Sequence, residues 1–130
     1  MATITEDYVS FETAKLLKEK GFDARCPMIY TADGELLYTD VKHHNMYAVT
    51  NKQLYYYTDI IAPSQAIAMK WLREVHNLYI DIRININNSL YSFQIYSVGI
   101  SGARAFTKYR IKSYEAACEE AILYCLKNLI

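Results

Sequence analysis

The chain has 130 residues, of which 52% are hydrophobic and 22% charged, a balance that excludes a disordered chain and indicates a single globular domain over residues 1–130. Its 14 basic and 14 acidic residues give zero formal net charge, so it lacks the general attraction of basic proteins to nucleic acid. Three cysteines at irregular spacing favour a reducing cytoplasm over a disulfide framework. With no signal-peptide pattern and no apolar run long enough to span a bilayer, we expect a cytoplasmic protein without membrane contact.

The first predicted element is a helix at residues 11–20. Ser10 can cap its first turn with the side-chain oxygen, and Gly21 can adopt the left-handed conformation that ends a helix. Phe22 can then fold back on Leu17, so both ends of this helix are marked in the sequence.

A β-hairpin is predicted next, with strands at about residues 28–32 and 35–39. Asp33 and Gly34 lie between the two strands. This pair is typical of a two-residue turn in which both residues adopt positive φ, so we expect the chain to reverse direction there.

Residues 40–63 show no clear helical or strand period, and we expect some extended structure near residues 45–58. Three consecutive tyrosines fall within this segment. In an extended conformation Tyr55 and Tyr57 would point to one side and Tyr56 to the other, so at most two of the three rings share a face. Tyr55 and Tyr57 are therefore candidate binding residues.

The second half of the chain is predicted to begin with a helix that starts after Ser64 and ends at Asn77. Its apolar face is expected to hold Ala68, Trp71 or Leu72, and Val75. A last helix is predicted after Ser113, with a buried stripe made of Ala117 or Cys118, Ala121 or Ile122, Cys125 and Leu129.

Strict alternation in "LYIDIRINI" predicts a strand at residues 78–86 with its isoleucines on one face. A two-residue turn at Asn87 and Asn88 would bring back a second strand that ends near residue 96, and a third strand is predicted at residues 104–111. The register that brings the apolar residues of the first two strands to one face pairs Ile84 with Tyr91, Ile82 with Phe93 and Ile80 with Ile95. The predicted order is α-β-β, an irregular segment, then α-β-β-β-α, which defines an α+β domain with an antiparallel sheet.

Three stretches of the chain resemble small uncharacterised proteins from phages and mobile elements of gut anaerobic bacteria: "YVSFETAKLLKEKGFD" at 8–23, "APSQAIAMKWLREVHN" at 62–77 and "SYEAACEEAILYCLKNLI" at 113–130. The resemblance implies a bacterial cytoplasmic setting and carries no assigned activity. The element order of residues 64–129 also resembles that of a double-stranded RNA-binding domain. That family places phosphate-binding lysines at the start of its last helix, where this chain has Glu115, Glu119 and Glu120, so the RNA-binding function does not carry over.

The sequence offers little for catalysis or for a metal. Cys118 and Cys125 lie seven residues apart among apolar side chains, which is typical of inert buried thiols. His43 and His44 could approach Cys26, but adjacent histidines without a Cys-x-x-Cys pair do not match the spacing of zinc sites. No nucleophile or phosphate-loop motif is present, so we expect no enzyme, no cofactor and no metal.

The outer face of the predicted sheet is the most informative surface. Its aromatic candidates are Tyr79, Tyr96 and Phe106, and its basic candidates are Arg83, Lys108 and Arg110. Rings interleaved with cations on an open sheet can hold single-stranded nucleic acid by stacking and by neutralising phosphates. The same pattern is also what an ordinary half-exposed antiparallel sheet shows, and Asp81 dilutes the positive charge.

A protein-interaction or assembly module fits the sequence best. The chain has 13 tyrosines, and tyrosine is enriched in protein-binding surfaces because it buries a large area at low entropic cost. The partner would be another protein or a second copy of the chain, since a net charge of zero also favours self-association. Single-stranded nucleic acid is the alternative partner.

Overall fold

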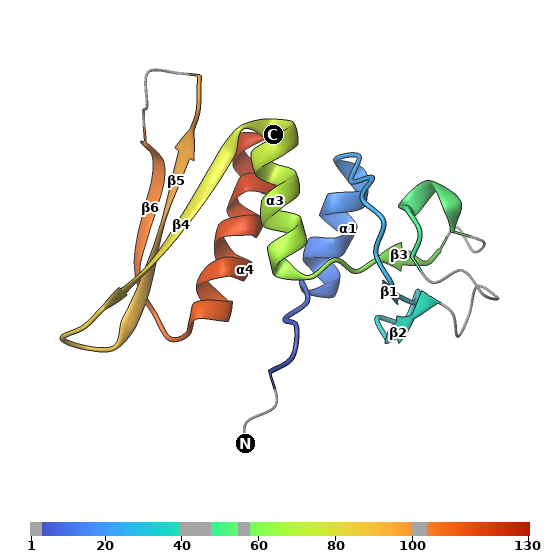
Figure 1. Ribbon diagram of the computed structural model, residues 1–130, viewed down its shortest axis with the longest axis horizontal. Coiled ribbons are helices and arrows are strands. Elements are labelled where there is room, and N and C mark those ends of the chain that lie inside the picture. The colour runs from blue at the N-terminus through green and yellow to red at the C-terminus, as the bar shows by residue number, and fades with distance from the viewer. Residues whose placement is uncertain (1–3, 40–47, 55–57, 100–103) are drawn as a thin grey trace. The chain divides into compact units, whose positions relative to one another are not determined.

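The computed structural model describes residues 4–39, 48–54, 58–99 and 104–130 and has the predicted α+β class (Figure 1). The chain divides into two compact units, residues 1–64 and 65–130. Each unit has its own three-stranded antiparallel sheet, in the order β2-β1-β3 in the first unit and β4-β5-β6 in the second. A single domain over the whole chain stays a prediction.

The first unit begins with helix α1, Phe11–Glu19, which has the two predicted ends. Ser10 Oγ accepts a hydrogen bond of 3.1 Å from the amide of Thr13 in the first turn. Gly21 adopts a φ of 88° after the last turn, and the amide of Phe22 donates to the carbonyl of Leu17 at 2.9 Å. These bonds satisfy backbone groups that would otherwise lack a partner, so the caps determine where the helix starts and stops.

The first hairpin forms, but with a different turn from the one predicted. Its strands are β1, Met28–Tyr30, and β2, Leu36–Tyr38, and Tyr30 lies opposite Leu36. Positive φ occurs at Gly34 (84°) and not at Asp33. The amide of Gly34 bonds to the carbonyl of Thr31, and the amide of Thr31 bonds to the carbonyl of Glu35. Three residues therefore make the loop, as in a type I turn closed by one left-handed residue.

The expectation of extended structure near residues 45–58 holds at Val49, which forms an isolated antiparallel bridge with Cys26. Asn51–Gln53, within the same segment, form the short 3-10 helix η1. Asn51 explains this: its side chain donates to the carbonyl of Phe22 and accepts from the amide of Ile61, which joins the turn to strand β3, Ile60–Ile61. Residues 40–47 and 55–57 lie outside the described residues.

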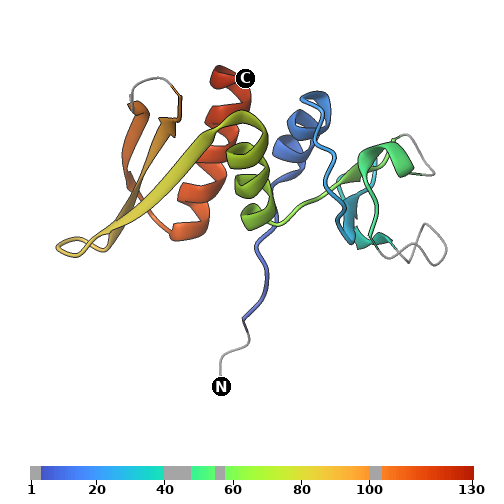
Figure 2. The same ribbon diagram turned by 45° about the horizontal axis from the view of Figure 1, so that its top comes forward.

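The second unit has two layers, because helices α3 and α4 both lie on one face of the sheet (Figure 2). Its elements are α3, Gln65–His76; β4, Leu78–Asn85; β5, Leu90–Ser97; β6, Arg104–Ile111; and α4, Tyr114–Tyr124, which continues into the π-helical turn η2, Cys125–Leu129. The core lies between the layers and includes Leu72, Phe93, Ile95, Ile122 and Leu126, all fully buried.

The long hairpin has the predicted register, with Ile84 opposite Tyr91 and Ile80 opposite Ile95. Its turn differs from the prediction. Ser89 adopts the positive φ (59°). The side-chain oxygens of Asn85 and Asn88 accept hydrogen bonds from backbone amides of the loop and of Leu90. Four residues form the loop instead of two, and the pairing is unchanged because the apolar alternation of both strands determines it.

The helices of the second unit have the predicted ends. Asn77 ends α3 with a φ of 56°, and Ser113 Oγ caps α4 by accepting from the amide of Ala116 at 3.1 Å. Two buried positions were predicted wrongly. Val75 is 54% exposed, because the apolar face of α3 stops at Trp71 and Leu72. In α4 the π-helical turn brings Leu126 into the core and leaves Leu129 half-buried.

Candidate functional site

The face of the second sheet that lies away from the helices is the candidate site. No described element of the second unit covers it. The open face consists of Tyr79, Asp81, Arg83 and Asn85 of β4, Leu90, Ser92, Gln94 and Tyr96 of β5, and Thr107, Tyr109 and Arg110 of β6. Tyr79 lies directly opposite Tyr96, as the sequence predicts, and Arg83 lies opposite Ser92.

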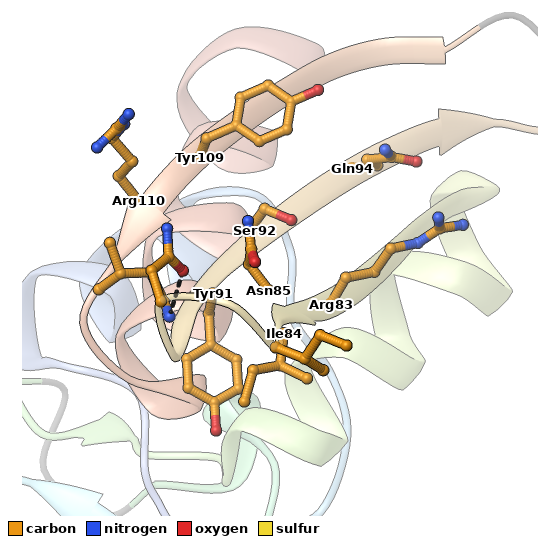
Figure 3. A pocket seen from close by; sticks show the side chains of 11 residues that line it. Arg83, Ile84, Asn85, Tyr91, Ser92, Gln94, Tyr109 and Arg110 are labelled. Carbon is orange, nitrogen blue, oxygen red and sulfur yellow. Dashed lines mark hydrogen bonds between the residues drawn. The ribbon is translucent and has the colours of Figure 1, made fainter.

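A β-bulge in β6 decides which of its side chains reach the open face. Tyr91 pairs with Ile111, but Phe93 pairs with Lys108, so Ser92 faces two residues, Tyr109 and Arg110. Arg110 adopts a φ of 62°, so the backbone is left-handed at this irregularity. Both Tyr109 and Arg110 therefore point to the open face (Figure 3).

The bulge also corrects the prediction for Phe106 and Lys108, which lie on the helix side of the sheet. Phe106 stacks on Tyr124 of α4 with ring centroids 3.8 Å apart. The ammonium Nζ of Lys108 lies 2.6 Å from Oε1 of Glu120. Strict alternation would put both on the same face as Arg110, and the extra residue breaks that alternation.

A hollow of about 640 Å³ opens on this surface near the turn of the long hairpin (Figure 3). Arg83 of β4 and Arg110 of β6 line it from the two edge strands, and Tyr109 of β6 lines it as well. The other residues that line it are Ile84, Asn85, Ile86, Asn88, Leu90, Tyr91, Ser92 and Gln94. The hollow therefore combines two guanidinium groups, several side-chain amides and one exposed ring.

The charges on the open face largely cancel. Arg83 Nε donates to Oδ2 of Asp81 at 2.8 Å, and this carboxylate raises the pKa of Arg83 above its ordinary value. Among the described residues, Arg110 makes no ion pair, so its guanidinium is the cation available to a ligand at the hollow. With one available cation and several tyrosines among its described side chains, this part of the face is weakly basic and mostly neutral.

Tyr109 is a site residue that the sequence reasoning missed, although it is 63% exposed. Simple alternation along residues 104–111 puts it on the core side together with Ile111. A signal was present: Phe106 and Ile111 are both apolar and five residues apart, and a regular strand cannot put both on one face. That odd spacing indicates a bulge between them.

The other candidate groups do not form a site in the part of the chain that the structure describes. Burial raises the pKa of Cys26 to about 11 and that of Cys125 to about 12, which keeps these thiols protonated and unreactive. No group of three His, Cys, Asp or Glu side chains gathers among the described residues. The candidates Tyr55 and Tyr57 lie outside those residues, as do His43 and His44.

Comparisons with protein-family models, with curated proteins and with solved structures found no match for this chain. Within the described residues, no helix combines the length and the apolar character that a membrane span requires. The class that the fold itself defines is a small α+β protein with two antiparallel sheets.

Proposed function

We propose that this chain is a non-enzymatic, cytoplasmic interaction module that binds a protein partner on the open face of its second sheet. The observation that carries the proposal is the bulge, which puts Tyr109 and Arg110 side by side at the hollow. An origin in a phage or mobile element is part of the proposal and rests on the resemblance of residues 8–23, 62–77 and 113–130.

The chemistry of the open face supports a protein partner. Protein-binding surfaces are rich in tyrosine and arginine and poor in other charged residues. Tyr79 is 41% exposed and Tyr109 is 63% exposed, so both rings can lose contact with water when a partner binds. The Asp81–Arg83 pair is already formed in the chain, so its charges do not need a partner to satisfy them.

The partner that fits the hollow presents a carboxylate beside an apolar side chain. The guanidinium of Arg110 can donate two parallel hydrogen bonds to a carboxylate. The side chains of Asn85 and Gln94 add neutral donors and acceptors, and Leu90 and Tyr109 supply apolar area. An acidic segment of another protein matches this combination of groups.

Single-stranded nucleic acid is the weaker alternative. Phosphate binding needs several cations whose charge is not already compensated. Arg83 is paired with Asp81, and Lys108 lies on the helix side paired with Glu120. Of the three cations that suggested nucleic-acid binding, Arg110 alone remains on the open face without an ion pair among the described residues.

Quantitative affinity capture from a lysate of the native host tests the proposal. We expect the protein held by the wild-type chain to be lost with the Tyr109→Ala and Arg110→Asn variants. Asn removes the charge and still tolerates positive φ, so Arg110→Asn should not disturb the bulge. The matched controls are Tyr38→Ala and Arg25→Asn, which change exposed residues of the first unit and should retain the captured protein.

Two results would reject the proposal. One is a captured protein that the open-face variants retain as well as the controls do. The other is salt-dependent binding of a single-stranded DNA oligonucleotide that Arg110→Asn weakens, which would establish the nucleic-acid alternative instead. Lys108→Ala should leave capture unchanged, because Lys108 lies on the helix side of the sheet.

A further inference from the structure

Strand β4 forms one edge of the second sheet. The sheet order is β4-β5-β6, and within the described part of the chain no strand pairs with the outer side of β4. All eight of its residues pair with β5 without a register shift, and it contains neither proline nor glycine. A long, regular edge of this kind is a template for another strand, and proteins usually block such an edge unless they use it.

The backbone of β4 has a defined set of outward groups. The amide of Val98 donates to the carbonyl of Asn77, so the backbone of Asn77 faces β5. The direction of the backbone N–H and C=O groups alternates from one residue to the next along an antiparallel strand. The backbone groups of the odd-numbered residues of β4 therefore also point to β5. The amides and carbonyls of Ile80, Ile82 and Ile84 therefore point to the open edge.

The sequence of β4 is complementary to itself in the antiparallel direction. If Ile82 lies opposite Ile82 of a second copy, Ile80 lies opposite Ile84 and Asp81 opposite Arg83. The outward backbone groups of the isoleucines then bond to each other, and the two Asp81–Arg83 pairs fall at the closely spaced positions between those bonds. If the two β4 strands paired about Asp81 or about Arg83 instead, that residue would lie opposite its own copy, and two like charges would meet.

The isoleucines of this edge are only partly covered. Ile80 and Ile82 are half-buried and Ile84 is 52% exposed, whereas their neighbour Phe93 on the central strand is 1% exposed. A second β4 strand would cover the exposed side of all three residues. Burial of apolar area thus favours the same register as the charges.

We propose that two copies of this chain pair through their β4 edges, with a twofold axis at Ile82, to form one continuous antiparallel sheet. Such a contact uses the same residues of both copies, as twofold dimers do. The opposite edge does not fit this role, because β6 carries the bulge at Arg110 and its charged residues Lys108 and Arg110 have the same sign. The proposal concerns the edge of the sheet and does not depend on partner binding at the open face.

Sedimentation equilibrium of the purified 130-residue chain and its charge-reversal variants tests this proposal. We expect the wild-type chain to form a reversible dimer. Asp81→Arg and Arg83→Asp should each weaken self-association about tenfold or more, because each puts like charges opposite one another twice. Asp33→Arg and Arg25→Asp make the same charge changes at exposed positions of the first unit and should leave the dimer intact.

Mixing the two variants separates pairing between chains from the ion pair within each chain. Asp81→Arg carries two cations on β4 and Arg83→Asp carries two carboxylates, so neither chain can form its internal pair. In a mixed dimer both cross-strand pairs become complementary, and we expect the mixture to recover a heterodimer. A wild-type chain that stays monomeric, variants that dimerise like the wild type, or a mixture that does not associate would each overturn the proposal.

Discussion

At the scale of single residues, left-handed backbone conformation marks places where an element ends or changes its pairing. Asn77, Ser89 and Arg110 all adopt positive φ, and each lies at a point where the chain ends an element or changes its pairing. Asparagine tolerates this conformation, whereas serine and arginine adopt it at a cost of about 1 kcal/mol. Arg110 bears that cost where its side chain enters the candidate site, which is common at functional positions.

Ser89 offers a direct test of this cost. Replacing Ser89 with glycine should raise the free energy of unfolding by about 0.5 kcal/mol, because glycine has no Cβ and reaches positive φ readily. Ser89→Val should lower it by about 1 kcal/mol, since a β-branched residue is poorly tolerated there. Urea denaturation of the three chains measures the difference, and an equal stability for glycine and valine would contradict the assigned turn.

At the scale of elements, local signals predicted the helices and the long hairpin, and longer-range effects decided the rest. Caps at Ser10 and Ser113 mark helix starts because they satisfy amides within three residues. The alternation of apolar residues determined the register of β4 and β5. The spacing of Phe106 and Ile111 indicates a bulge between them, but its position at Arg110 and the π-helical turn after Tyr124 depend on how the sheet and helix meet.

The bulge makes opposite predictions for two aromatic residues of β6. Phe106→Ala should lower the free energy of unfolding by about 2–3 kcal/mol, because Phe106 packs against Phe93 and stacks on Tyr124. Tyr109→Ala should change it by no more than about 0.5 kcal/mol, because Tyr109 is an exposed residue of the open face. Chemical denaturation distinguishes the two variants. A larger loss of unfolding free energy for Tyr109→Ala than for Phe106→Ala would show that Tyr109, and not Phe106, lies on the helix side of the sheet.

At the scale of the whole molecule, two surfaces of the second sheet have separate roles in this account. We propose that the open face binds a protein partner and that the β4 edge pairs with a second copy. A twofold axis at Ile82 is perpendicular to the sheet, so the open faces of the two copies would lie on the same side. A dimer would then present two equivalent binding faces, which strengthens binding to any partner with two matching sites.

Hydrogen–deuterium exchange of the chain with and without its captured partner tests whether the partner binds at the open face. We expect the partner to slow exchange in β5 and in β6 around Tyr109 and Arg110, and to leave helix α1 and strands β1–β3 of the first unit unchanged. Amides near a contact exchange more slowly because binding opposes local opening of the sheet. Protection confined to the first unit, or to α3 and α4 on the opposite side of the sheet, would contradict binding at the open face.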